Sequence, residues 1–441
     1  MAPPPLRILV CGGGLAGPSL AFWLTRVGCD VTVVERTGEL RASGQQIDIR
    51  AQGVTAMRKM GIERAIRAHV VDEPGMRSVD KDGKPFAFVE ANKTGKGRQN
   101  MTSEFEIMRG DFCRILHDAT KEKTKYIFGL HVTDFEQLDD GRGGGVRVHF
   151  SDGTQEVYDL LVGADGQSSK IRRLMLSKEG REDALERKGL NFAWYSIPAQ
   201  EGDSNAMTIH VSPGRRWTVT RQDDPEYLRV YYMASTTGMP EDHPLQRCHR
   251  GGSTVEEQKK AWADYFRGTA WQSERFIRGM DAPAAEDFYA CEALQVKLDS
   301  YSRGRVTLVG DAASCASPLS GMGTGISLVG AYCLAGEIAR HCKLSADGPA
   351  ELDRDPREGL AAGLKAYEET VRPFVANAQH LMPGLPDIIM PKSQLGVSFL
   401  NWLLWLMVTL RMDKLAAMLS SDDIGGWELP EYPELGSIQV L

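Results

Sequence analysis

Closely spaced cysteine pairs are missing from this sequence. The 441 residues include eight cysteines, but no two of them form a C-x-x-C pair, and most lie inside apolar runs. Such cysteines are typical of reduced, buried thiols, so we expect no disulfide framework and a cytoplasmic location. The spacings of metal ligands and of a nucleophile triad are missing too, and we expect neither a metal site nor a catalytic nucleophile.

The sequence has no excess of positive charge. Lys and Arg number 52 and Asp and Glu number 59, which gives a formal net charge of −7. Binding to a nucleic-acid backbone depends on clustered cations that neutralise phosphates. Nucleic acid is therefore not an expected partner, and a small molecule fits the composition better.

Long uninterrupted apolar runs are scarce. The N-terminus has no signal core, and the apolar segment at 395–410, LGVSFLNWLLWLMVTL, is broken by three polar residues. A spanning helix needs about 20 apolar residues, so we expect no transmembrane segment. A buried helix or a lid is the favoured interpretation. A helix at a membrane surface is the alternative, because Trp402 and Trp405 lie between Lys392 and Arg411.

A glycine-rich turn near the N-terminus is the first positive signal. The stretch VCGGGLAGPSLA, residues 10–21, follows an apolar strand and opens a helix, with the spacing Gly12-x-Gly14-x-x-Gly17. Such glycines permit a tight turn, let backbone N–H groups approach a pyrophosphate and allow close packing of helix on strand, while Glu35 after the next strand can accept ribose hydroxyls. The motif predicts an adenine dinucleotide but does not separate NAD from FAD.

A second glycine-rich segment favours FAD. In RGRVTLVGDAASCASPLSGMGTG, residues 303–325, Asp311 directly follows an apolar strand, and Gly321 and Gly323 precede a helix. An aspartate there can reach a ribityl hydroxyl, which NAD does not have, and a helix N-terminus faces negative charge favourably. The alternative is an ordinary strand-to-helix loop.

The remaining chain predicts two further sheets. Residues 131–163 alternate as a β meander, and three more β runs lie between about 190 and 235. Helical patterns follow at 254–278 and in the C-terminal tail. No second glycine fingerprint follows residue 150, so a dedicated nicotinamide domain is not expected.

Three segments in this order resemble the para-hydroxybenzoate hydroxylase-like class A flavoprotein monooxygenases, the family that includes the tetracycline-inactivating monooxygenases. They are GGGLAGPSLA with Glu35, DLLVGADGQSSKIR at 159–172, and RVTLVGDAASCASPLSGMGTG. The resemblance extends from about residue 6 to about residue 375. It implies an α/β fold with a Rossmann-like FAD-binding domain, a mixed sheet with a β meander, a β-sheet substrate domain and a C-terminal helical region.

The resemblance also implies domain boundaries. The FAD-binding domain would take residues 1–75, 100–175 and 290–370, and the substrate-binding domain 76–99 and 176–289. Residues 371–441 would form the C-terminal helical region.

Cofactor contacts follow from the same resemblance. It implies contacts with the ADP half of FAD, with the linking chain and ribityl group, with the flavin ring, and with the visiting NAD(P)H, and the residues concerned are Gly12, Gly14, Gly17, Glu35, Arg36, Asp48, Arg109, Asp165, Asp311, Gly321 and Gly323. Two of these have an ordinary structural alternative. Arg109 can simply open an amphipathic helix, and Asp165 can belong to a common Asp-Gly turn.

Substrate contacts are expected from the β runs of the second domain. His210 shares a strand face with Thr208 and Ser212, and Arg229 shares one with Tyr231. By the resemblance, His210 falls near a position that contacts substrate in the tetracycline-inactivating enzymes. A structural histidine on a half-exposed strand is the alternative.

The implied function is an FAD- and NAD(P)H-dependent monooxygenase. It would insert one oxygen atom from dioxygen into an aromatic or polycyclic small molecule through a flavin hydroperoxide, in secondary metabolism or in the modification of foreign compounds. One alternative is a flavin-dependent reductase or dehydrogenase of the same fold that does not use oxygen. The other is a flavin-binding protein without enzymatic activity.

Overall fold

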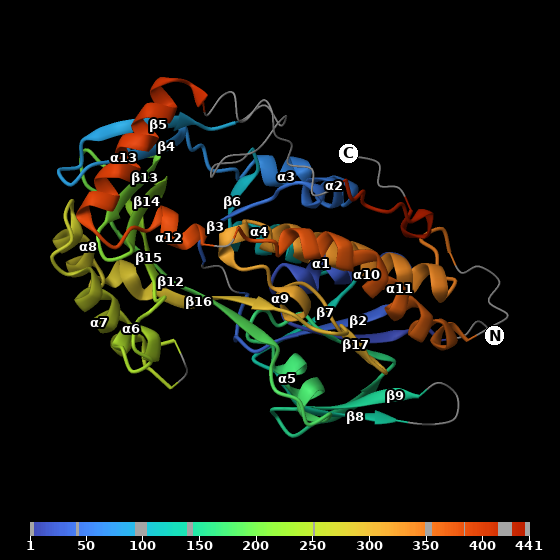
Figure 1. The fold of residues 1–441 in the computed structure, drawn as a ribbon. Coiled ribbons are helices and arrows are strands. Elements are labelled where there is room, and N and C mark those ends of the chain that lie inside the picture. Colours follow the sequence, from blue (N-terminus) through green and yellow to red (C-terminus); the bar gives the residue numbers. More distant parts are fainter. Residues whose placement is uncertain are drawn as a thin grey trace.

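Two large β-sheets, each with its own helices, form the body of the protein (Figure 1). The structure is a computed structural model, and it describes residues 4–40, 44–92, 104–138, 144–249, 252–348, 355–382, 384–412 and 426–436. This architecture confirms the predicted α/β fold with two sheets and a helical C-terminal region.

The first sheet contains the N-terminal β-α-β unit that the sequence predicts. Its strand order is β17 (Ser302–Arg303), β18 (Val306–Leu308), β11 (Leu160–Gly163), β1 (Arg7–Cys11), β2 (Asp30–Glu35) and β7 (Lys125–Phe128). All neighbours pair in parallel except β17 and β18. The apolar residues of β1 and β11 are buried, as expected for parallel strands covered on both faces.

Helices cover this sheet. The helix α1 (Ala16–Arg26) follows the glycine turn, and α10 (Gly323–His341) contacts α1, α2 (Gln52–Lys59) and α11 (Leu360–Ala378). Residues 324–339 of α10 are all buried. A helix that is apolar around its whole circumference belongs in a core, and α10 occupies that place.

Smaller elements connect the sheets. The predicted β meander is a three-stranded antiparallel sheet of β8 (Val132–Leu138), β9 (Gly145–Phe150) and β10 (Gln155–Tyr158). Strands β3 (Gln46–Asp48) and β6 (Glu106–Met108) pair with each other. The short or connecting helices here are α3 (Glu63–Arg67), α4 (Arg109–Asp118), α5 (Lys170–Ser177) and α9 (Asp311–Ser314).

The second sheet has seven strands. Their order is β16 (Tyr289–Val296), β12 (Leu185–Pro198), β15 (Tyr227–Ser235), β14 (Arg216–Asp224), β13 (Met207–Ser212), β4 (Gly75–Val79) and β5 (Pro85–Glu90). One face packs against α6 (Pro244–Arg247), α7 (Val255–Phe266) and α8 (Ser273–Gly279), and Trp262 and Phe276 are buried there. The exact domain boundaries stay a prediction, since β16 itself crosses the expected boundary at residue 290.

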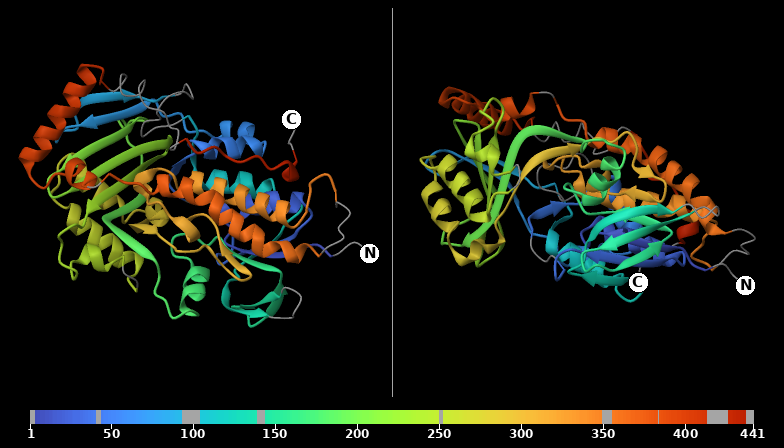
Figure 2. Two further views of the ribbon diagram at one scale, coloured as in Figure 1. Left: turned by 45° about the vertical axis from the view of Figure 1, so that its right-hand side comes forward. Right: turned by 90° about the horizontal axis from the view of Figure 1, so that it is seen from below.

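The C-terminal helices lie beside the second sheet. They are α12 (Leu385–Ile389) and α13 (Gln394–Thr409), and α13 contacts β5 and β13 at the end of the molecule remote from the N-terminus (Figure 2). The prediction of a buried helix at 395–410 is wrong, because only Val397 of α13 is buried and Leu395 is 83% exposed. Among the described residues, no helix is long and apolar enough to cross a membrane.

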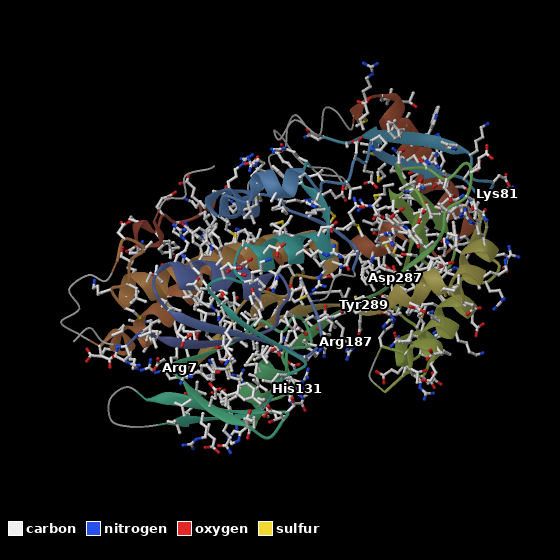
Figure 3. The ribbon with its side chains drawn as sticks, turned by 180° about the vertical axis from the view of Figure 1, so that it is seen from behind. Arg7, Lys81, His131, Arg187, Asp287 and Tyr289 are labelled. Carbon is white, nitrogen blue, oxygen red and sulfur yellow. The ribbon has the colours of Figure 1, made fainter. Side chains whose placement is uncertain are left out.

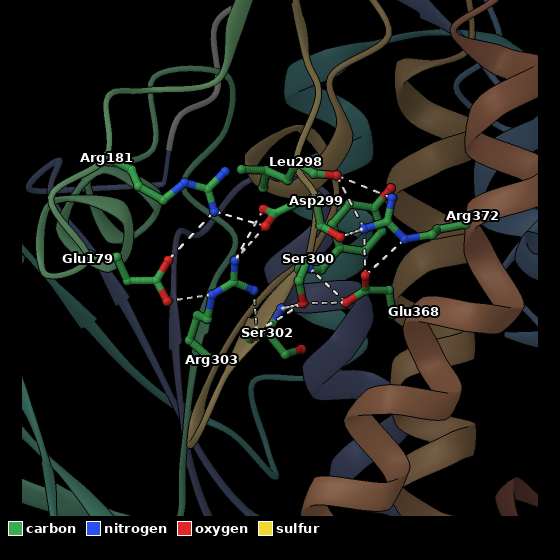
Figure 4. Close-up of polar contacts among 10 residues, drawn as sticks. Glu179, Arg181, Leu298, Asp299, Ser300, Ser302, Arg303, Glu368 and Arg372 are labelled. Carbon is green, nitrogen blue, oxygen red and sulfur yellow. Dashed lines mark hydrogen bonds and ion pairs between the residues drawn. The ribbon is translucent and has the colours of Figure 1, made fainter.

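A polar network ties distant segments of the first sheet's body together (Figure 4). Arg303 on β17 donates to Glu179 at 2.8 Å and to Asp299 at 3.1 Å, and Arg181 donates to Asp299 at 2.9 Å. The hydrogen bond from Arg181, together with the charge of Arg303, holds the pKa of Asp299 at about 2. These contacts join the segment after α5 to the loop between β16 and β17.

We expect Gly17→Ala to destabilise the protein. A Cβ atom at Gly17 would lie 2.0 Å from the carbonyl oxygen of Gly12, so α1 would have to move away from β1. Such overpacking typically costs about 1–3 kcal/mol. The measurement is the midpoint of thermal unfolding of the FAD-free protein. Gly38→Ala is the matched control, because nothing lies within 4 Å of a Cβ atom there, and equal midpoints for both variants would contradict the packing argument.

Candidate active site

A cavity of about 840 Å³ lies between the two large sheets. It is lined by residues of both glycine-rich segments, of the Asp-Gly segment and of the second sheet. Tyr289, at the start of β16 in the lining, lies in the middle part of the molecule (Figure 3). The cavity therefore joins the segments that the sequence separates by about three hundred positions.

The polar end of the cavity lies where four parallel strands end. Strands β18, β11, β1 and β2 are neighbours in the first sheet, and their carboxyl ends lead into Asp311, Asp165, Gly12 and Glu35. Ligands of open parallel sheets bind at this edge. All four of these residues line the cavity.

The turn after β1 requires glycine at its first position. Gly12 has φ +120°, and a Cβ atom there would lie 2.4 Å from the carbonyl oxygen of Ala164. The Gly13 N–H donates to Glu35 Oε2 at 2.8 Å, and the Thr37 N–H donates to Glu35 Oε1 at 3.0 Å. The Glu35 carboxylate is thus held at the turn, and the exposed Arg36 follows it at the cavity wall.

Asp311 is the least satisfied acid of the cavity. Its Oδ1 atom is buried and has no hydrogen-bond partner among the described residues. Burial raises the pKa of Asp311 to about 6, although the charge of Arg109 opposes this shift. Gly323 at the start of α10 lies close by, since a Cβ atom there would be 3.8 Å from Asp311 Oδ1. A buried acceptor without a donor is suited to a ligand hydroxyl.

Arg109 lies between the first glycine-rich segment and the loop at Gly44. It opens α4, and its backbone N–H donates to the Gln45 carbonyl at 3.1 Å. Its side chain passes Gly44, where a Cβ atom would be 3.1 Å from Arg109 Cδ, and one guanidinium nitrogen would be 3.5 Å from a Cβ atom at Gly14. The guanidinium therefore lies beside the glycine turn.

Asp165 has a structural task in addition to its place in the cavity. Its carboxylate accepts hydrogen bonds from Ser169 Oγ at 2.5 Å and from the Lys170 N–H at 2.7 Å. It therefore caps the N-terminus of α5, where negative charge is favourable. The neighbouring Arg172 is fully buried against Asp183, at 2.6 Å, and is a structural residue.

The other predicted cofactor residues also fall on this cavity, apart from Gly17. Asp48 on β3 forms an ion pair with Arg50 at 2.7 Å, and Gly321 lies in the loop before α10. Gly17 lies behind the turn, packed against Gly12. The glycine turn, the ordered acceptor Glu35 and the unpartnered Oδ1 atom of Asp311 together fit a dinucleotide that carries a further hydroxylated chain.

The other end of the cavity is aromatic. Phe192 and Trp194 stack with ring centroids 5.7 Å apart, and Trp194 and Tyr289 stack at 5.6 Å. Tyr231 meets Trp194 edge-on at 6.5 Å. Burial raises the pKa of Tyr231 to about 12, so its hydroxyl keeps its proton at neutral pH. Met207, Val219 and Met233 add apolar surface, and this end suits a flat apolar ligand.

The sequence did not predict the charged residue Arg221 in the cavity wall. Arg221 of β14 is 8% exposed, lines the cavity and forms ion pairs with Glu106 at 2.5 Å and Glu73 at 3.1 Å. Burial raises the pKa of Glu106, whereas the two carboxylates keep the pKa of Arg221 above its ordinary value. In the sequence, Arg221 is noticeable only as an arginine within an apolar β run. The strand register in the structure is needed to show that it faces the cavity.

Two of the three predicted substrate residues lie away from this cavity. His210 points to the opposite face of β13, where it contacts the Val79 carbonyl at 3.2 Å and lies 6.0 Å from the Trp271 ring. Arg229 shares a face with Tyr231, but it is held away from the cavity by Asp223 at 2.7 Å. Of the three, only Tyr231 is in the lining of this cavity, and contact of His210 or Arg229 with a substrate stays a prediction.

Residues 6–370 match the family described as FAD binding domain, and the chain belongs to this family. It is 40% identical over 438 residues to the FAD-dependent monooxygenase asL4 of Sarocladium schorii, covering 98% of this chain and 99% of that one. It is 38% identical over 440 residues to the flavin-dependent monooxygenase eupH of a Phoma species, with 98% and 99% covered.

A solved structure is also similar to this chain. The tetracycline destructase Tet(51) superimposes with a TM-score of 0.72 and 28% identity, over 98% of this chain and all of that one. These matches confirm the prediction of an FAD-dependent monooxygenase with FAD as its cofactor. NAD(P)H is the cosubstrate typical of the family.

We expect Asp311→Asn to stabilise the FAD-free protein at pH 8, because an amide avoids the cost of burying a charge. Asp311 has an ordinary pKa of 3.8 and one of about 6 in the fold. The gain should therefore be on the order of 2–3 kcal/mol above pH 6, shrink as the pH falls towards 4, and vanish below about pH 3, where the acid is protonated in both the folded and the unfolded state.

Thermal unfolding of the apoprotein at several pH values measures this difference. The exposed Asp281→Asn is the control and should change the midpoint little at any pH. A constant difference between Asp311→Asn and wild type from pH 4 to 8 would rule out the buried charge as its cause.

Proposed function

We propose that this enzyme adds one oxygen atom of dioxygen to an aromatic or polycyclic small molecule held at the aromatic end of the cavity. The single observation that carries the proposal is the continuity of the cavity from the glycine turn at Gly12 to the stacked rings of Phe192, Trp194 and Tyr289. The second oxygen atom leaves as water, and NAD(P)H supplies the electron pair.

The polar end would hold FAD. We assign the ADP half to the Gly12 turn, Gly14, Glu35 and Arg36, and the linking chain to Arg109 and Asp311. Asp165, Asp48, Gly321 and Gly323 would complete the contacts, with Gly17 supporting the turn from behind. When bound, FAD supplies the redox chemistry that takes electrons from NAD(P)H and activates dioxygen.

The N-terminus of α10 would face the ring end of the cofactor. Gly323, Thr324 and Ser327 of its first turns line the cavity, and the helix has 19 residues. The partial positive charge of a helix N-terminus stabilises nearby negative charge. This chain's contribution there would be electrostatic and would need no titratable side chain.

The aromatic end would position the substrate and exclude water. Trp194 and Tyr289 offer ring faces, and the Tyr231 hydroxyl, which keeps its proton, offers a hydrogen bond. Arg221 lies in the same wall, where its charge is paired with Glu73 and Glu106. A substrate with an acidic or carbonyl oxygen next to its rings would accept the hydrogen bond of the Tyr231 hydroxyl.

NAD(P)H would visit the cavity rather than occupy a domain of its own. Lys170 and Arg173 line the cavity beside the Asp-Gly segment and offer positive charge to a phosphate. The setting would be cytoplasmic, in secondary metabolism or in the modification of a foreign compound. Seven of the eight cysteines are buried and all are free, which suits a reducing compartment.

Turnover under labelled dioxygen tests the proposed reaction. The purified holoenzyme is incubated with NADH or NADPH, ¹⁸O₂ and a panel of phenols and polycyclic aromatic ketones. We expect a product that carries one ¹⁸O atom and whose formation accompanies oxidation of the nicotinamide. A reduced product without label would instead identify a reductase, and nicotinamide oxidation that never yields a modified aromatic would overturn the substrate assignment.

We expect Arg109→Met to weaken FAD binding by about tenfold or more, because hydrogen bonds to a charged group are worth about 1.5–3 kcal/mol. Titration of the apoprotein with FAD, followed by flavin fluorescence, gives the dissociation constant. Arg114→Met is the matched control on the same helix, since Arg114 is exposed and pairs with Asp111. Equal affinities in both variants would remove Arg109 from the cofactor site.

A further inference from the structure

The helix α13 exposes an unusual amount of apolar surface. Among the described residues, five large apolar side chains of α13 and two just beyond its end are exposed: Leu395 (83%), Phe399 (64%), Trp402 (52%), Leu403 (37%), Trp405 (46%), Leu410 (60%) and Met412 (46%). Only Val397 is buried. Contiguous apolar surface of this kind marks an interaction site.

The exposed side chains form a stripe. Phe399 follows Leu395 by four residues, and Trp402 and Leu403 follow Phe399 by three and four, so all four lie on one face of the helix. Two further large apolar side chains near α13 in the fold or in the sequence are exposed: Phe88 on β5, a strand that contacts α13, at 43%, and Ile388 on the preceding helix α12 at 62%. We call these six side chains the apolar stripe.

The charges within the segment 388–412 have one sign, whereas outside it Asp387 pairs with Arg215 and the exposed Glu90 lies on β5 near Phe88. Residues 388–412 contain no Asp or Glu, although the whole chain has a net charge of −7. The two cations of the segment, Lys392 and Arg411, lie at opposite ends of α13 and both are exposed. Trp402 and Trp405 lie between them, and tryptophan is the side chain that favours the boundary between lipid and water.

We propose that α13 lies in the surface of a lipid bilayer that contains anionic phospholipids. The apolar stripe would enter the acyl boundary, and Lys392 and Arg411 would contact phosphate groups. The 16-residue helix is roughly 24 Å long, so it lies in the plane of the bilayer and does not cross it.

A second copy of the chain fits this surface less well. Two α13 helices related by a two-fold axis would bring Lys392 next to Arg411, or each cation next to its own copy, according to their direction. The segment 388–412 offers no carboxylate to pair these charges. Anionic headgroups supply the missing negative charge.

The bilayer contact would adjoin the active-site cavity. Val397 and Leu400 of α13 belong to the same hydrophobic cluster as Met207 and Val219, which line the cavity. A membrane-bound enzyme would therefore hold the wall of its cavity close to the lipid.

Vesicle sedimentation tests the proposal on the full-length, FAD-loaded protein. The probes are vesicles of phosphatidylcholine alone and of phosphatidylcholine mixed equally with phosphatidylglycerol. We expect sedimentation with the mixed vesicles, weaker sedimentation with phosphatidylcholine alone, and partial release by high salt, which screens charge but not apolar contact.

Substitutions identify the surface. Leu395→Gln, Phe399→Gln and Leu403→Gln combined should lower partitioning at least about tenfold, because three apolar side chains are lost. The matched control is Val157→Gln with Val255→Gln, which are 43% and 46% exposed on other elements. Lys392→Gln with Arg411→Gln should remove the preference for phosphatidylglycerol. The flavin-to-protein absorbance ratio confirms that each variant is folded.

A spectroscopic measurement uses the unaltered apolar stripe. Vesicles with brominated acyl chains should quench part of the tryptophan fluorescence of the wild-type protein, and Trp402→Phe with Trp405→Phe should abolish the quenching. The proposal is overturned if the wild type stays in the supernatant with both vesicles, if the triple Gln variant sediments like wild type, or if the triple variant only converts a dimer into a monomer.

Discussion

The close contact between the Gly12 turn and the segment after β11 is the constraint on which the rest of the site depends. A Cβ atom at Gly12 would meet the carbonyl of Ala164, and one at Gly17 would meet Gly12 itself. Because no side chain intervenes, β1, β2, β11 and β18 end at one edge with α1 packed behind them. That edge is where the acids and glycines of three distant segments converge.

The two ends of the cavity differ in chemistry, one being polar and the other aromatic. At the first sheet, backbone N–H groups, Glu35 and Asp311 offer polar contacts. Larger side chains in place of the glycines would block access to them. At the second sheet, β12, β14, β15 and β16 contribute rings and apolar side chains from their inner face, with the buried Arg221 between Glu73 and Glu106. An aromatic end next to a polar end is suited to oxygen transfer to an apolar molecule.

The sequence was sufficient to predict those features whose structure depends on a single short segment. The glycine spacing, the acid after β2 and the aspartate after β18 each need only their neighbours in sequence, so the β-α-β unit, the meander and the cofactor class were predictable. The direction in which a strand side chain points was harder to predict. Alternation along β13 and β15 separates two faces, but it does not tell which face meets the cavity, and His210 and Arg229 were therefore expected there although they lie elsewhere.

The sequence by itself determined the cofactor class, the order of elements and the residues of the glycine turns, because backbone conformation and strand ends depend on local chemistry. Only the tertiary structure decided which residues share the cavity, that Arg221 is buried between two carboxylates, and that α13 leaves five of its large apolar side chains exposed. These properties arise from the register between strands and from which surfaces pack together, and such long-range contacts leave no local pattern in the chain.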